Sequence, residues 1–311
     1  MRKILITGGA GNIGSALTKK LLDDPNNVVI VVDNLQTGSR SKIPFDQNPN
    51  FKFIKADVNN YADISAIMLS YHFDVVFHYA ALVGVQRTLD NPVMVLNDIK
   101  GIENVLKLCK NTGVNRVFYS SSSEVYGEPV EYPQNEHTTP LNSRLPYAIV
   151  KNLGEAFLKS FHQEYGLNYT IFRFFNTYGP NQSEDFVIVK FLNAALANKD
   201  ITIYGDGSQT RTFLYIDDNV HVASQLLNEN LFVNDILNLG SDLETTILEL
   251  AELIIEMTNS SSKIIHLPPL EEGDMTRRQP SIEKMKSVLK KDYTPLREGV
   301  QRLINHIKAN A

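Results

Sequence analysis

Short apolar runs alternate with longer stretches of helical periodicity through the first half of the chain. The strand-like runs cover residues 3–7, 28–32, 51–54, 74–77, 116–119 and 169–175. Helical spacing, with apolar residues every three or four positions, covers residues 12–23, 62–69, 93–110 and 147–165. The run at 28–32 is apolar throughout, which is typical of a strand buried on both faces. This alternation predicts an α/β fold of Rossmann type with a doubly wound parallel sheet.

The pattern changes after Asn176, where turn-rich pieces such as Tyr204-Gly205-Asp206-Gly207 mix with short helices and strands. This change predicts a Rossmann domain over residues 1–175. A smaller α/β C-terminal domain, expected to bind the substrate, would cover residues 176–311. We expect segments of the second unit to cross back to the sheet.

Composition narrows the class of protein. Of the 311 residues, 43% are hydrophobic and 21% are charged, and the formal net charge of −5 argues against a general nucleic-acid binder. No apolar run reaches the roughly 18 residues that span a bilayer, and the single Cys109 excludes a disulfide framework. Met1-Arg2-Lys3 leads directly into a strand, so no signal peptide is predicted. We therefore expect a cytoplasmic protein that binds neither membrane nor nucleic acid and, with scattered histidines, no metal.

A glycine-rich turn follows the first predicted strand and opens the first helix. Thr7-Gly8-Gly9-Ala10-Gly11-Asn12-Ile13-Gly14 contains the glycine spacing of a dinucleotide-binding loop. Glycine lets the backbone approach a pyrophosphate closely, and the helix N-terminus offers N–H groups to it. Asp33, which ends the second strand, is the residue type that binds a ribose 2′-hydroxyl. Because a carboxylate repels a 2′-phosphate, NAD is favoured over NADP as the cofactor. Arg40 lies close enough in the sequence to keep NADP as an alternative.

Two polar segments are candidates for catalysis. Tyr147 and Lys151 are four residues apart and share one helix face. An ammonium near a phenol lowers the pKa of the phenol, so Tyr147 could take a proton from a substrate hydroxyl. Ser120-Ser121-Ser122-Ser123-Glu124-Val125-Tyr126-Gly127 follows a strand end, where open α/β sheets bind ligands. Taken singly, these segments also fit an exposed lysine on an ordinary helix and a solvated serine-rich loop.

Together these motifs resemble the extended short-chain dehydrogenase/reductases that modify nucleotide sugars, the NAD-dependent epimerase/dehydratase family. The resemblance continues at residues 175–180, 204–211 and 273–278, so it spans nearly the whole chain. It implies NAD as the cofactor and a nucleotide-diphosphate sugar, with a UDP-sugar favoured, as the substrate. It also implies a homodimer, because the helices at 93–110 and 147–165 resemble the family's dimer interface.

Carried over residue by residue, the resemblance implies that Ser122, Glu124, Tyr147 and Lys151 are catalytic. The implied cofactor contacts are Gly8, Gly11, Asn12, Ile13, Gly14, Asp33, Asn34, Asp57, Val58, Ala80, Ala81, Tyr147 and Lys151. The implied substrate contacts are Ser122, Ser123, Glu124, Asn176, Arg211, Arg277 and Arg278. Asn176, Arg211 and one or both of the paired arginines would hold the diphosphate, since a guanidinium pairs two phosphate oxygens at once. One position departs from the family, because Asp98 stands where an asparagine is usual.

The residues leave open which reaction follows oxidation of the sugar at C4. Glu124 and Arg278 resemble positions of UDP-glucuronate decarboxylases, as does Arg144, and a guanidinium near C6 would meet the sugar carboxylate. Residues 78–85 form a different signal, because they resemble the loop that 4-epimerases of the family carry at this place in the sequence. Ser123 replaces the aspartate of dTDP-glucose dehydratases, which disfavours that type of dehydratase. A 4-keto sugar intermediate is expected, with a slight preference for UDP-glucuronate decarboxylase over a UDP-hexose or UDP-hexuronate 4-epimerase, a 4,6-dehydratase and a non-catalytic dinucleotide sensor.

Overall fold

Seven parallel strands form the central sheet of the computed structural model, which describes residues 1–269 and 277–310. Their order is β11-β6-β5-β4-β1-β2-β3. The strands are β1 (Arg2–Thr7), β2 (Asn27–Asp33), β3 (Phe51–Lys55), β4 (Val75–His78), β5 (Arg116–Ser122), β6 (Asn168–Phe174) and β11 (Asp235–Leu239). The chain starts in the middle of the sheet and is wound outward in both directions. The predicted Rossmann-type fold is therefore confirmed.

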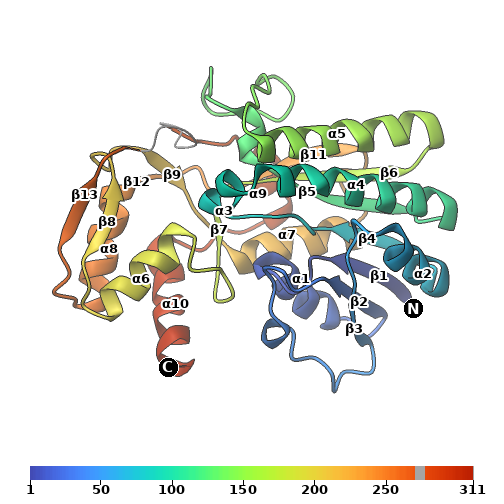
Figure 1. Cartoon of the computed structure of the whole chain (residues 1–311), viewed down its shortest axis with the longest axis horizontal. Coiled ribbons are helices and arrows are strands. Elements are labelled where there is room, and N and C mark those ends of the chain that lie inside the picture. The colour runs from blue at the N-terminus through green and yellow to red at the C-terminus, as the bar shows by residue number, and fades with distance from the viewer. Residues whose placement is uncertain (270–276, 311) are drawn as a thin grey trace.

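Helices cover both faces of this sheet (Figure 1). On one face lie α1 (Asn12–Leu22), α7 (Ile216–Asn228) and α9 (Glu283–Leu289), and on the other α2 (Tyr61–Tyr71), α4 (Pro92–Thr112) and α5 (Pro146–Tyr165). Successive strand residues alternate between the two cores: Val29 and Val31 pack in the first, and Ile30 and Val32 in the second. This double burial is the reason that residues 28–32 are apolar without interruption.

Proline and glycine set the ends of the two longest helices. Pro92 opens α4 and Pro146 opens α5, where the missing N–H leaves no hydrogen bond unmade. Gly113 and Gly166 end these helices with φ of +75° and +71°, a conformation that glycine adopts without strain. The helix predicted from the spacing of residues 147–165 is confirmed as α5. α4 and α5 pack against each other along the same face of the sheet.

A smaller α/β group lies beside the sheet (Figure 1). Its strand pairs are β7 (Thr177–Tyr178) with β10 (Leu214–Tyr215), β8 (Ile201–Tyr204) with β13 (Ile264–Leu267), and β9 (Thr210–Thr212) with β12 (Glu244–Thr246). Its helices are α6 (Val187–Leu196), α8 (Ile247–Thr258) and α10 (Leu296–Asn310). The remaining short elements are η1 (Arg40–Lys42), α3 (Val85–Asp90) and η2 (Ser123–Tyr126). Because β11, α7 and α9 return to the central sheet, the chain after residue 176 builds both parts, and a boundary at residue 175 stays a prediction.

Within residues 1–269 and 277–310, no helix is long and apolar enough to cross a membrane. In the same ranges, no group of three or more His, Cys, Asp or Glu side chains is placed to hold a metal ion.

Candidate active site

A cavity of about 1450 Å³ runs from the glycine turn, past the carboxyl ends of the central strands, to the smaller α/β group. Every predicted site residue lines it except Arg277. Its lining includes residues of the glycine turn, of η2 and α5, and of the strands β8 and β9. The fold therefore brings residues from both halves of the sequence to one elongated cleft.

The glycine turn presses the backbone against the β4 end of the sheet. Gly8 has a φ of +69°, and a Cβ on it would lie 2.6 Å from the backbone nitrogen of Ala80. A Cβ on Gly14 would lie 2.4 Å from the carbonyl oxygen of Gly8. The N-cap of α1, Gly11, provides no side-chain cap, and the first turn of α1 carries no acidic residue. The N–H groups at the start of α1 are donors that fit the pyrophosphate of a dinucleotide, whose oxygens accept hydrogen bonds.

Asp33 has a structural role in addition to the predicted one. Its Oδ2 accepts a hydrogen bond from the backbone N–H of Ala10 at 3.0 Å, and its Oδ1 accepts one from Leu35 at 2.8 Å. A carboxylate oxygen can accept a second bond, so both remain compatible with a ribose hydroxyl. Arg40, the residue that left NADP open, does not line the cavity, because its guanidinium bonds Asp46 and lies over the ring of Phe53.

Lys42 is a cavity residue that the sequence did not indicate. It lies at the end of η1, two residues after Arg40, and lines the cavity near Asp33. Burial lowers the pKa of Lys42, and the Asp33 carboxylate opposes this lowering. A basic residue in the turn after the second strand was the available signal, but sequence alone did not show that Lys42 rather than Arg40 turns inward.

Lys151 is buried at the centre of the cleft. Its Nζ donates hydrogen bonds to the carbonyl oxygen of Ser120 at 2.6 Å and to the Oγ of the same residue at 3.2 Å. The Nζ lies 5.7 Å from the centre of the Tyr147 ring, as expected for one helix face. Burial lowers the pKa of Lys151 to about 8, and the Asp98 carboxylate opposes this effect.

Tyr147 has a raised pKa. Burial is the main cause and the Glu124 carboxylate adds to it, while a hydrogen bond with Ser122 acts in the opposite direction. This direction is opposite to the lowering predicted from the Tyr147–Lys151 spacing. The physical reason is that loss of water around the phenol outweighs the positive charges nearby.

Glu124 and Arg278 form a shielded ion pair near Tyr147. Arg278 Nη2 lies 2.7 Å from Glu124 Oε1, and the two side chains are 6% and 16% exposed. Arg278 Nη1 also donates to the Oγ of Ser123 at 3.3 Å. Glu124 Oε2 and Arg278 Nε are buried and have no partner among the described residues. The pair therefore retains hydrogen-bonding capacity for a ligand.

Arg277 points away from the cleft, unlike its neighbour. Its guanidinium makes two hydrogen bonds of 2.7 Å to the Glu244 carboxylate and lies 4.2 Å from the centre of the Tyr132 ring. The predicted contact of Arg277 with the diphosphate thus has no support in the geometry, because Arg277, unlike Arg278, does not line the cavity. Residues 273–276 of the same predicted segment lie outside the described residues.

The two other predicted diphosphate residues line the cavity, as does Arg278. The Nδ2 of Asn176 donates to the carbonyl oxygen of Thr212 at 3.0 Å. The Nη1 of Arg211 donates to the carbonyl oxygen of Thr210 at 2.8 Å. Both side chains are thus anchored to the backbone of β9.

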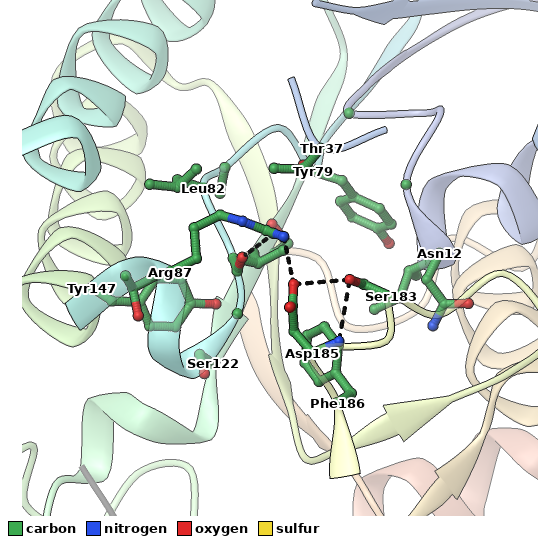
Figure 2. A pocket seen from close by; sticks show the side chains of 18 of the residues that line it. Asn12, Thr37, Tyr79, Leu82, Arg87, Ser122, Tyr147, Ser183, Asp185 and Phe186 are labelled. Carbon is green, nitrogen blue, oxygen red and sulfur yellow. Dashed lines mark hydrogen bonds and ion pairs between the residues drawn. The ribbon is translucent and has the colours of Figure 1, made fainter. Parts of the chain in front are cut away.

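An ion pair that no sequence motif indicated spans the cavity (Figure 2). Arg87 on α3 pairs with Asp185, which lies just before α6. Asp185 Oδ2 also accepts a hydrogen bond from Ser183 Oγ at 2.9 Å, and Arg87 Nη1 donates to the Val83 carbonyl oxygen at 2.9 Å. The contact joins residues 98 positions apart, so local spacing carried no signal for it.

Residues 4–240 match the family model described as "NAD dependent epimerase/dehydratase family". The chain belongs to this family. NAD is the cofactor of the NAD-dependent epimerase/dehydratase family, as the glycine turn and Asp33 predicted. The match covers the central sheet except for the first two residues of β1, and it also covers β7 to β10.

Relatives within the family catalyse different reactions. UDP-glucuronic acid decarboxylase 1 of Danio rerio is 36% identical over 314 residues, which are 98% of this chain and 72% of that protein. UDP-N-acetyl-alpha-D-glucosaminuronate decarboxylase of Bacillus cytotoxicus is 35% identical, with 92% and 91% covered. The crystal structure of UDP-glucose 4-epimerase with UDP-glucose from Thermotoga maritima has a TM-score of 0.92 and 31% identity, and 99% of each chain is covered. The chain is therefore an enzyme of this nucleotide-sugar family.

Proposed function

We propose that the protein removes the C6 carboxylate of UDP-glucuronate through a 4-keto sugar. The observation that carries this proposal is the Glu124–Arg278 ion pair beside Tyr147. A guanidinium that lines the cavity next to the base is suited to bind a carboxylate on the sugar. The decarboxylases among the relatives support the same reaction.

Tyr147 is the proposed base for the first step. Hydrogen-bonded to Ser122, it would accept the proton of the sugar 4-hydroxyl, and Ser122 would hydrogen-bond the same oxygen. NAD, when bound, supplies the oxidation and later the re-reduction of the sugar at C4. Lys151 would stabilise the phenolate form of Tyr147 and bind the nicotinamide ribose.

The 4-keto group makes loss of the carboxylate possible. The bond between C5 and C6 breaks, carbon dioxide leaves, and the electron pair passes through C5 to the oxygen on C4. A proton must then return to C5. Arg278 would hold the carboxylate in line for this cleavage. Glu124 would hold Arg278 in place, and its carboxylate would relay a proton from water to C5. Arg211 and Asn176 would bind the nucleotide diphosphate.

A homodimer is also proposed. Four exposed apolar side chains lie on two helices that pack against each other, Val93 and Leu96 on α4 and Ile149 and Leu153 on α5. Val93 is 73% exposed. A second copy of the chain would bury this face as a four-helix contact.

A UDP-sugar 4-epimerase is the second candidate. The resemblance of residues 78–85 to an epimerase loop favours it, as does the full-length likeness to the Thermotoga maritima epimerase. This reaction shares the oxidation at C4 and needs no carboxylate on the sugar, so Arg278 would then not be required for carboxylate binding.

The test is incubation of the purified protein with a panel of nucleotide sugars, followed by mass spectrometry and NMR of the products. Loss of carbon dioxide from UDP-glucuronate is the expected result. An unchanged mass with a new anomeric signal would identify an epimerase, and loss of water would identify a dehydratase. Tyr147→Phe should lower turnover by at least about a hundredfold while NAD binding persists. No turnover of any sugar by the wild type would identify a dinucleotide sensor.

A further inference from the structure

A chain of buried hydrogen bonds runs beneath the candidate active site, and it starts on the helix that carries Tyr147 and Lys151. Glu155 lies four residues after Lys151 on α5 and accepts a hydrogen bond from Ser121 Oγ at 2.6 Å. Arg173 on β6 makes two bonds to the same carboxylate, at 2.9 and 2.7 Å. Glu155 and Arg173 are each 1% exposed, so this pair is fixed inside the protein.

The chain of bonds continues toward the second half of the sequence. Arg173 Nη1 donates to the hydroxyl of Tyr126 at 2.8 Å, and that hydroxyl donates to Asn238 Oδ1 at 2.8 Å. Tyr126 and Asn238 are both fully buried. Asn238 lies on β11, the strand that the second half of the chain adds to the sheet.

Asn238 holds together two backbone segments that are far apart in the sequence. Its Nδ2 donates to the carbonyl oxygens of Gln134 at 2.9 Å and Ser281 at 3.3 Å. The same segments also bond each other, from Gln134 N–H to the Gln279 carbonyl at 2.7 Å and from Ser281 N–H to the Gln134 carbonyl at 2.8 Å. These bonds flank Arg278 on its C-terminal side. Arg278 itself lies in neither a helix nor a strand, so its backbone position depends on such contacts.

We propose that Asn238 is a positioning residue for the reaction, which holds residues 279–281 so that Arg278 meets Glu124 inside the cleft. This inference rests on the proposed role of Arg278. A displacement of about 1 Å at a group that orients substrate is enough to lower a rate strongly. Within residues 1–269 and 277–310, the hydrogen-bond partners of Asn238 do not line the cavity, so its effect on catalysis would pass through Arg278.

A double-mutant cycle on kcat/KM tests this inference. Asn238→Ala should lower kcat/KM at least tenfold without weakening NAD binding. In an enzyme that already carries Arg278→Ala, Asn238→Ala should cause little further loss of kcat/KM, because the guanidinium that Asn238 positions is already absent. Additive losses would overturn the proposal, as would an Asn238→Ala enzyme with wild-type kcat/KM. If the alanine variant does not fold, Asn238→Asp removes the Nδ2 donor while retaining the size and the Oδ1 acceptor.

Tyr126→Phe is the matched control. It removes the hydroxyl bonded to Asn238 Oδ1 but leaves the Nδ2 bonds to Gln134 and Ser281. Its effect should be smaller and additive with Arg278→Ala. Equal non-additivity in this control would overturn the assignment to Asn238 in particular.

Amide hydrogen exchange separates this inference from the proposed reaction. In Asn238→Ala, the N–H groups of Gln134 and Ser281 should exchange faster than in the wild type, whichever sugar the enzyme converts. Unchanged exchange would overturn the positioning role even if UDP-glucuronate is decarboxylated. If UDP-glucuronate is not decarboxylated, the proposed function fails, and the cycle is then measured with the sugar that the wild type converts.

Discussion

The amine of Lys151 is buried and almost completely shielded from water. The side chain is 3% exposed, and its Nζ is bonded to the carbonyl and hydroxyl oxygens of Ser120. Because burial penalises the charged form, the pKa of Lys151 falls from 10.5 to about 8. Near neutral pH the amine is mostly protonated, which suits a group that is to stabilise a phenolate at Tyr147.

Lys151→Met should reveal this lowered pKa in the pH dependence of stability. Between about pH 8 and 10.5 the unfolded chain binds more protons at this lysine than the folded chain, so this lysine makes wild-type stability rise with pH. The free energy of unfolding of Lys151→Met minus that of the wild type should therefore decrease between pH 7 and 10, by about 3 kcal/mol. Urea unfolding at four pH values measures it, and a pH-independent difference would contradict the lowered pKa.

Gly8→Ala should weaken NAD binding at least tenfold. The added Cβ would meet the backbone of Ala80 at 2.6 Å, and the φ of +69° is strained for alanine. Gly113→Ala is the control, since Gly113 has a similar φ of +75° but nothing within 4 Å of the added Cβ. Titration calorimetry with NAD should show wild-type affinity for the control. Equal losses of affinity in both variants would assign the effect to backbone strain and not to the close approach.

At the scale of elements, the short helix α3 and the segment before α6 meet only through tertiary packing. Arg87 and Asp185 are partly exposed, at 31% and 39%, so their ion pair contributes little to stability, within about 1 kcal/mol. The ion pair lies across the cavity, where a substrate would bind. We expect an anionic substrate to compete with Asp185 for the guanidinium of Arg87, because both residues line the cavity.

Asp185→Asn should therefore lower the KM for the nucleotide sugar severalfold, because it frees Arg87 for the anionic substrate. The melting temperature should change little. Ser183→Ala, which removes only the hydroxyl bonded to Asp185, is the matched control and should keep a KM close to that of the wild type. Steady-state kinetics at low ionic strength measures the effect, and a KM equal to or above the wild-type value would refute the competition.

At the scale of the whole molecule, the exposed apolar face of α4 and α5 predicts self-association. Leu153→Glu should convert a dimer into a monomer in sedimentation velocity experiments, since a charge would be buried without a partner. Leu243→Glu is the control: Leu243 is 64% exposed and lies between β11 and β12, away from this face. A wild-type protein that stays monomeric at micromolar concentration would refute the homodimer.

The sequence predicted the parts of the molecule whose geometry is local. The apolar runs predicted six strands of the central sheet, because a strand that is buried on both faces appears in the sequence as a short continuous apolar run. The glycine turn and the Tyr147–Lys151 pair were found for the same reason, since each lies within one turn or one helix. The sequence did not indicate that β11 would be the seventh strand, or that the short α3 would form.

The local spacing by itself determined a Rossmann-type fold, and it indicated a candidate NAD-binding turn and a candidate base on a helix. Only the tertiary structure decided which charged groups meet. It turned Arg278 inward to Glu124 and Arg277 outward to Glu244, although the two arginines are neighbours. It also brought Arg87 to Asp185 and made Asn238 a junction of distant segments. Such contacts depend on how strands and loops that are far apart in the sequence pack together, and no local period in the sequence encodes them.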